Sequence, residues 1–187
     1  GAELWKTDGT ALGTVLVKDI NPGAAGSGIV FSKGTGNNTL INTLFFVAND
    51  GVNGAELWKT DGTGPGTQMV KDISAGSVST VFASKFETVY AANVLFFLAN
   101  DNINGLELWR TDGSTGGTYM VKNINPSGDG FFSDMNYIVF NNKLYFGPSV
   151  NTALWVSDGT IAGNQVVTNR NSLTLSRHEN YDKAVLY

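Results

Sequence analysis

The chain has 187 residues, of which 42% are hydrophobic, so it is long enough to form one domain with its own core. Its net charge is −4 and it has no cluster of lysine or arginine, which argues against nucleic acid or an anionic membrane as a partner. No apolar run approaches the roughly 20 residues of a membrane span, so membrane insertion is not expected. The absence of cysteine excludes disulfides and thiolate metal sites, and 23 glycines with few charged residues favour an all-β protein rich in turns.

The first segment, residues 1–10, is predicted to form a strand that runs into a tight hairpin turn. Side chains alternate in type from Glu3 to Thr7, which is the two-residue period of a strand. Asp8-Gly9 then supplies the turn, because glycine accepts a positive φ and aspartate tolerates it. A second alternating run at residues 14–20 completes a β-hairpin.

This segment recurs along the chain. Residues 54–63 repeat residues 1–10 letter for letter, residues 105–114 form a closely similar copy, and residues 153–160 form a degenerate one. The turn aspartates stand at positions 8, 61, 112 and 158, so the repeat is about 50 residues long. An alternating run follows each copy, and the sequence therefore predicts four hairpins.

Apolar strands are expected between the hairpins, each with another candidate strand before it. The apolar strands are predicted at residues 43–48, 94–99, 143–146 and 184–187. The strands before them are predicted at residues 28–31, 81–84 with 86–90, 137–140 and 172–175. One period thus holds about four short strands, which is the size of a β-propeller blade.

These elements predict a single four-bladed β-propeller over residues 1–187. The chain starts on the third strand of a period and stops on the second, so its terminal strands together would complete one blade and remove exposed sheet edges. The predicted blades are residues 1–20 with 172–187, 28–74, 79–125 and 131–168. Two alternatives stay open: a stretch cut from a longer repeat array, and pairing of the terminal half-blades between molecules.

Four segments share the pattern Glu-Leu-Trp-x-x-Asp-Gly-Thr: Glu3–Thr10, Glu56–Thr63, Glu107–Ser114 and, in part, Leu154–Thr160. This pattern resembles the ELWxxDGT repeat family of bacterial secreted and cell-surface proteins. The resemblance implies a propeller-like domain with an extracellular or cell-surface location and no established chemistry. The fourth copy departs from the pattern, because Thr152 and Ala153 stand where the glutamate is expected.

No catalytic residue is predicted. The single histidine, His178, lies outside the repeats, and the sequence contains neither Gly-x-Ser-x-Gly nor His-Glu-x-x-His. The repeated acids Glu3, Glu56 and Glu107 are expected to bond to neighbouring backbone, because every blade poses the same packing problem. The tryptophans at positions 5, 58, 109 and 155 are expected to pack between blades rather than to stack on sugar rings.

Two loops that precede hairpins are candidate Ca²⁺ sites, because they are dense in oxygen donors. The donors are Asn49, Asp50, Asn100, Asp101, Asn102 and Asn104. Asparagine, aspartate and glycine also form ordinary turns, and the turn interpretation is favoured over the metal site. No other cofactor is predicted.

The repeats, the acidic composition and the missing catalytic motifs, together with the extracellular location that the family resemblance implies, predict an extracellular, non-enzymatic binding or adhesion module. Its partner would be a glycan or a cell-surface or extracellular protein. A second hypothesis is a structural subunit that assembles through its terminal strands into oligomers or filaments. A third is a glycan-active enzyme, which would need two acids facing one cleft.

Overall fold

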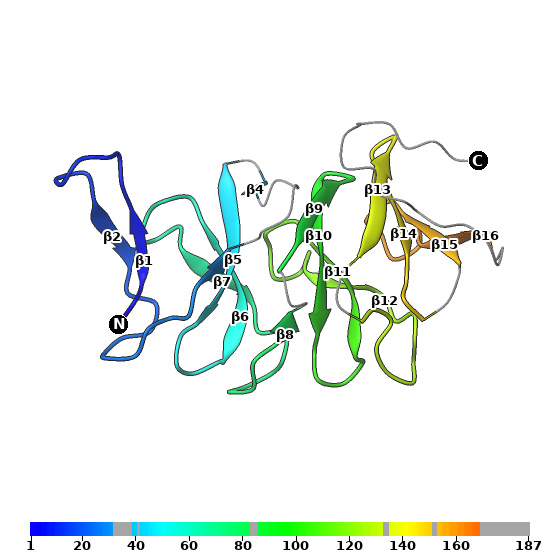
Figure 1. Ribbon diagram of the computed structural model, residues 1–187, viewed down its shortest axis with the longest axis horizontal. Helices are drawn as coiled ribbons and strands as arrows, with labels where there is room; N and C mark the ends of the chain where they lie inside the picture. The colour runs from blue at the N-terminus through cyan, green and yellow to red at the C-terminus, as the bar shows by residue number, and fades with distance from the viewer. Residues whose placement is uncertain (32–38, 41, 83–85, 133–134, 151–152, 169–187) are drawn as a thin grey trace.

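The computed structural model describes residues 1–31, 39–40, 42–82, 86–132, 135–150 and 153–168. Within these residues all regular structure is β, in four antiparallel sheets. Figure 1 shows the sheets side by side along the long axis, with the first hairpin at one end of the row and the last sheet at the other. A search of the same residues finds no helix with the length and apolar character needed to cross a membrane.

The sheets follow the order of the chain. The first sheet contains β1 (Leu4–Lys6) and β2 (Val15–Lys18). The second contains β3 (Val30–Phe31), β4 (Thr39–Leu40), β5 (Thr43–Asn49), β6 (Ala55–Thr60) and β7 (Gln68–Lys71). The third contains β8 (Val81–Phe82), β9 (Thr88–Ala91), β10 (Val94–Asn100), β11 (Leu106–Thr111) and β12 (Tyr119–Lys122). The fourth contains β13 (Asn136–Phe140), β14 (Lys143–Gly147), β15 (Leu154–Ser157) and β16 (Gln165–Thr168).

The predicted all-β class is confirmed, and so are the hairpins and the apolar strands that lie within the described ranges. In the last three sheets the hairpin is extended by the apolar strand: β5 pairs with β6, β10 with β11 and β14 with β15. By contrast, the only described strand that pairs with β1 is β2. The strands predicted at residues 172–175 and 184–187, which were to complete the first blade, lie outside the described residues.

The loop within each hairpin is longer than the tight turn that Asp-Gly predicts; in the first hairpin β1 ends at Lys6 and β2 begins at Val15. The prediction of a tight turn is therefore wrong. Asp8 Oδ1 accepts hydrogen bonds from the backbone N–H and the hydroxyl of Thr10, at 2.9 and 2.8 Å. Thr10 Oγ1 in turn accepts from Gly13 N–H at 2.9 Å, and the hydroxyls of Thr7 and Thr14 bond to each other at 2.8 Å. These side-chain hydrogen bonds stabilise a longer loop in place of the backbone pairing of a two-residue turn.

The central strands are buried on both faces because each lies between two neighbouring sheets. Successive side chains of a strand point to opposite faces, so Phe46 packs against Leu4 of the first sheet and Phe45 packs toward the third sheet. The same alternation recurs in β10, where Phe97 packs toward the second sheet and Phe96 toward the fourth. The double phenylalanine of the repeat therefore belongs to two different layers of core.

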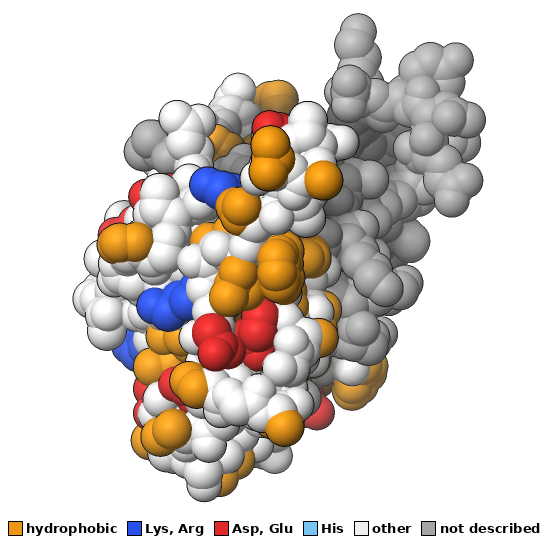
Figure 2. All heavy atoms as spheres, turned by 90° about the vertical axis from the view of Figure 1, so that its left-hand side faces the viewer, with side chains coloured by type: hydrophobic (Ala, Val, Ile, Leu, Met, Phe, Trp, Pro, Cys, Tyr) orange, Lys and Arg blue, Asp and Glu red, His pale blue; other side chains and the backbone are white. Residues whose placement is uncertain are grey.

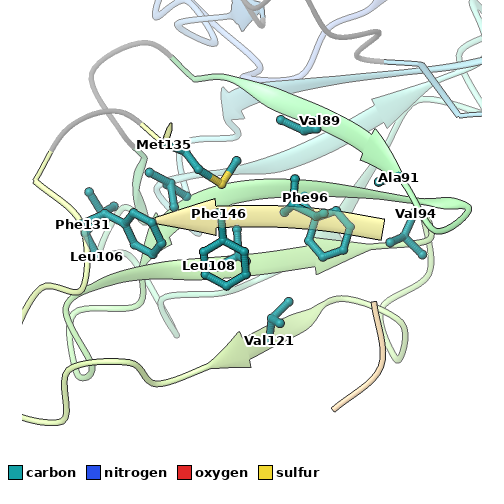
Figure 3. Close-up of a cluster of buried hydrophobic side chains, with 12 residues drawn as sticks. Val89, Ala91, Val94, Phe96, Leu106, Leu108, Val121, Phe131, Met135 and Phe146 are labelled. Carbon is teal, nitrogen blue, oxygen red and sulfur yellow. The ribbon is translucent and has the colours of Figure 1, made fainter. Parts of the chain in front are cut away.

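Figure 3 shows the layer between the third and fourth sheets. Phe96 of β10 and Leu108 of β11 face Phe146 of β14, and Phe131 and Met135 close one end of the layer. The ring centroids of Phe131 and Phe146 are 6.2 Å apart. Each of the three apolar clusters in the described chain is shared by two adjacent sheets, so the core is a series of inter-sheet layers.

Basic side chains also join each hairpin to the next one. In one series the donor follows the repeated tryptophan and the acceptor is the backbone oxygen of the next turn glycine: Lys6 to Gly62 (2.9 Å), Lys59 to Gly113 (2.7 Å) and Arg110 to Gly159 (2.9 Å). In a second series the donor is a lysine of the second hairpin strand: Lys18 to Thr67 O (2.9 Å) and Lys71 to Thr118 O (2.8 Å). All five bonds point from the earlier hairpin to the later one, so the row of sheets has a polarity. In the fourth copy, Val156 and Thr168 stand at the donor positions and carry no charge.

Candidate functional site at the loop edge

Loops that follow the apolar strands gather along one long edge of the row, the lower edge in Figure 1. They alternate there with the segments that connect successive sheets. We call this surface the loop edge and define it by residues 49–54, 74–79, 100–105 and 125–132. Asp50 and Asp101 occupy equivalent places in its two strand-end loops, and Figure 1 shows both loops on this edge.

The two strand-end loops share one hydrogen-bond pattern, which is built on their aspartates. Asp50 Oδ1 accepts from the N–H groups of Val52 and Asn53 at 2.9 and 2.7 Å, and Asp50 Oδ2 accepts from Asn53 Nδ2 at 2.7 Å. Asp101 does the same with Ile103 and Asn104, at 3.0, 2.7 and 2.7 Å. Partial burial alone would raise the pKa of both carboxyls, but these hydrogen bonds outweigh it and hold each pKa below its usual value.

The predicted Ca²⁺ donors are thus engaged in the loops themselves. Asn102 Nδ2 donates to Ser79 O at 3.1 Å, and Asn104 Oδ1 accepts from Asn123 Nδ2 at 3.1 Å. Across the part of the chain that the structure describes, no three acidic, histidine or cysteine side chains form a group that could hold a metal ion. This arrangement agrees with the favoured turn interpretation, and Ca²⁺ binding stays a prediction.

We expect added Ca²⁺ to raise the melting temperature by a few degrees at most. A site with few carboxylates binds Ca²⁺ with a Kd on the order of 10⁻⁴–10⁻³ M, so millimolar Ca²⁺ adds at most about 1.4 kcal/mol of stability. Calorimetry with Ca²⁺ and with EDTA measures the shift for the natural chain, for Asp101→Ala and for Asp61→Ala, a turn aspartate at the opposite edge. A large shift that only Asp101→Ala abolishes would contradict the turn interpretation.

The repeated acids bond to backbone, as predicted. Glu56 is fully buried and accepts from Ile73 N–H at 2.9 Å, and from Thr80 through its N–H at 3.1 Å and its hydroxyl at 2.8 Å. Glu107 is also fully buried and accepts from Ile124 N–H at 3.1 Å. Burial raises the pKa of both carboxyls above the usual value, against the opposing effect of these hydrogen bonds. The repeated glutamate therefore ties its hairpin to the segment that leads to the next sheet.

Glu3 accepts a hydrogen bond from the equivalent backbone N–H, but its side chain is less buried than those of Glu56 and Glu107. It accepts from Ile20 N–H at 2.9 Å and is only partly buried. Burial raises its pKa less than the hydrogen bonds from Ile20, Ser27 and Asn21 lower it, so the pKa lies below the usual value. The opposite shifts of Glu3 and Glu56 follow from their different burial, because the first hairpin has neither a described sheet outside it nor a described strand beside β1 in the place of β5.

The repeated tryptophans also differ in burial between the first hairpin and the later ones. Trp58 and Trp109 are each 6% exposed, and Trp155 stacks on Phe146 with ring centroids 6.4 Å apart. The predicted packing role is confirmed for these three. It is wrong for Trp5, which is 57% exposed although its ten-residue segment is identical to that of Trp58.

The sequence analysis missed the exposed apolar side chains of the loop edge. Val52 is 69% exposed and Ile103 is 86% exposed, at equivalent tips of the two strand-end loops. Val78 and Phe132 are exposed on or beside the connecting segments. A signal was available in the sequence, because an aliphatic residue recurs before asparagine in two loops whose polar residues are needed for the turn.

Comparison with known proteins did not identify a relative of this chain. A scan against protein-family models, a search of curated proteins and a search of solved structures found no match. The likeness to ELWxxDGT repeats therefore stays a prediction, and His178 lies outside the described residues.

Proposed function

We propose that the protein is an extracellular, non-enzymatic binding module that contacts a protein ligand through its loop edge. The observation that carries the proposal is the set of exposed apolar side chains at this edge, with Val52 and Ile103 at equivalent loop tips. Single exposed apolar residues are normal on a protein surface. Here an exposed aliphatic side chain recurs at the same loop position of two adjacent sheets, so one elongated ligand can contact both loop tips.

Hydrogen bonds between loops support this role, because they hold the edge in one conformation. Ala55 N–H donates to Ser79 Oγ at 2.9 Å, and Asn102 bonds to the same segment from the next sheet. Leu106 N–H donates to Asp129 Oδ1 at 2.7 Å. A surface that is ordered before binding loses less conformational entropy when a ligand arrives.

The chemistry of the edge favours a protein ligand over the glycan that was the other predicted partner. Sugars are bound by aromatic faces together with free polar groups. Phe132 is an exposed aromatic side chain of the edge, but both strand-end loop tips are aliphatic, and Asp50 and Asp101 are engaged in turns. Aliphatic tips suit the apolar side chains of another protein.

The use of the repeated acids supports a function without catalysis. A glycosidase needs two carboxyl groups about 5–10 Å apart that face one cleft. Glu56 and Glu107 are instead buried in separate sheets, where they accept hydrogen bonds from backbone N–H groups.

A double substitution at the loop tips tests the proposal. We expect Val52→Ser with Ile103→Ser to weaken binding to an array of extracellular proteins at least tenfold, while Leu12→Ser, an exposed residue of the opposite edge, leaves binding unchanged. Both variants should melt like the natural chain, because the replaced side chains are exposed. Equal binding by the loop-tip variant, or binding confined to a glycan array, would contradict the proposal.

A second candidate function is a structural subunit that assembles by strand pairing at β1. β6, β11 and β15 each pair on both edges, whereas β1 has one described partner. The first hairpin and the fourth sheet also lie at opposite ends of the row (Figure 1). In the closed four-bladed propeller, residues 172–187 of the same chain would take the free edge instead. Mass measurement over a dilution series separates the two, because a strand-exchanged assembly stays large on dilution.

A further inference from the structure

The face that carries the repeated tryptophan is covered by the preceding sheet wherever a preceding sheet is described. Trp58 lies directly across the hairpin from Met69, and Trp109 from Met120. The first pair packs in the layer shared with the first sheet, and the second pair in the layer shared with the second sheet. In both layers, this face of the repeat packs against apolar side chains of the preceding sheet.

The first hairpin presents the same pair without a cover. Trp5 lies directly across from Leu16, and the two side chains are 57% and 44% exposed. Figure 2 looks onto this end of the row and shows hydrophobic side chains gathered in its middle beside acidic ones. We call the uncovered surface of the first hairpin that contains Trp5 and Leu16 the outer face.

The outer face also repeats the acceptor groups of the other hairpins. Gly62 O and Thr67 O accept hydrogen bonds from Lys6 and Lys18 of the preceding hairpin. Gly113 O and Thr118 O accept the equivalent bonds from Lys59 and Lys71. The corresponding oxygens of the first hairpin belong to Gly9 and Thr14, and no donor from a lysine of the described chain reaches them.

We propose that the outer face is a docking surface for a further sheet of this same repeat, which packs on it through the face that carries Leu4 and Ile20 in the first sheet. Such a sheet brings an apolar layer for Trp5 and Leu16 and two lysines for Gly9 O and Thr14 O. The inference extends interfaces that already exist in the molecule, and it does not depend on the proposed ligand of the loop edge.

The fourth sheet of a second copy does not meet these requirements. Val156 and Thr168 replace both lysine donors. Leu154, the equivalent of Leu57, is already buried. The partner is therefore a sheet with the sequence features of one of the first three sheets, each of which carries a basic residue at both donor positions.

The test lengthens the chain by one repeat. Residues 1–53 are duplicated ahead of Gly1, which recreates the natural junction of Asn53 with Gly54 because residues 1–10 and 54–63 are identical. The added copy carries Trp5→Phe, so that the lengthened and natural chains have the same tryptophans. A matched control adds only residues 28–53, which supply edge strands for β1 but no covering sheet.

Acrylamide quenching of the original Trp5, isolated by difference from its own Trp5→Phe variant, is the measurement. We expect the quenching constant of Trp5 to fall several-fold in the 1–53 extension, to the level of Trp58. In the 28–53 control it should fall less, because only the neighbouring strand with Phe46 and Ala48 then shields the ring. Replacing Lys6 and Lys18 of the added copy by methionine should lower the melting temperature as much as replacing Lys59 and Lys71 does in the natural chain.

Three results would overturn the inference. One is equal quenching of Trp5 in the natural, control and lengthened chains. Another is failure of the 1–53 extension to fold while the control folds, since its junctions all occur in the natural sequence. The third is protection of Trp5 in the natural chain at high protein concentration, which would make a second copy the occupant.

Discussion

Replacing Trp58 by alanine should lower the free energy of unfolding by about 3–5 kcal/mol, whereas Trp5→Ala should cost less than about 1 kcal/mol. The two residues stand in identical ten-residue segments, so local propensity is matched. Trp58 is 6% exposed between two sheets, while Trp5 is 57% exposed. The indole nitrogen of Trp58 has no hydrogen-bond partner in the described structure, so the expected loss comes from packing alone.

Urea unfolding of the two variants beside the natural chain measures both values, with the m-value as a check that each variant still unfolds as one unit. The comparison needs no further control, because Trp5→Ala carries the same chemical change. Similar losses for the two substitutions would show that the outer face is covered in solution.

Glu56→Ala should lower the free energy of unfolding by about 2–5 kcal/mol, because each buried donor left without a partner costs about 1–3 kcal/mol. The donors are Ile73 N–H and the hydroxyl of Thr80. Glu3→Ala is the matched control and should cost less, because the acid in the first hairpin lies at an uncovered face. A loss at position 3 as large as that at position 56 would contradict the role of burial.

The loss at Glu56 should also depend on pH. The pKa of Glu56 is raised by folding above its ordinary value of 4.5, so folding favours the protonated form. Its contribution to stability is fully present below about pH 4.5 and declines as the pH rises through the folded-state pKa. The difference between the natural chain and Glu56→Ala should therefore be larger at pH 4.5 than at pH 7, and a larger difference at pH 7 would refute this assignment.

The stability contributed by Asp61 and Asp101 should depend on pH in the opposite sense to that of Glu56. The pKa of Asp61 and Asp101 lies below the ordinary value of 3.8, so their contribution is present above about pH 3.8 and is lost as the pH falls toward the folded-state pKa. Below pH 3.8 the loss of these turns works against the gain at the buried glutamates.

The sequence predicted those features that depend on local pattern. The paired phenylalanines at 45–46 and 96–97 indicate the apolar strands, and the Asp-Gly pairs mark the hairpins. The glycine of each pair has the positive φ that the turn prediction requires, for example +91° at Gly9. The length of the hairpin loop was not predicted, because it depends on threonine hydroxyls that replace backbone partners.

Features that depend on neighbouring sheets could not be found in the same way. Trp5 and Trp58 have identical local sequences, and their different burial follows from the strand beside β6 and the sheet before it, neither of which has a described counterpart at β1. At the candidate site, the residues of the calcium prediction stand at equivalent positions of two loops, and Ca²⁺ binding by them stays a prediction. Their use in turns and the exposure of Val52 and Ile103 follow from hydrogen bonds that composition does not specify.

The direction of the lysine bonds has a consequence for the order in which the molecule is made. Each of the last three sheets is built from one uninterrupted stretch of chain, so its strands can pair with short loop closures soon after they leave the ribosome. Lys6 and Lys18 are translated before Gly62 and Thr67, and Lys59 and Lys71 before Gly113 and Thr118. Each later hairpin thus emerges after the sheet that carries its basic donors has been made. The earlier sheet can therefore act as the surface on which the next hairpin packs during synthesis.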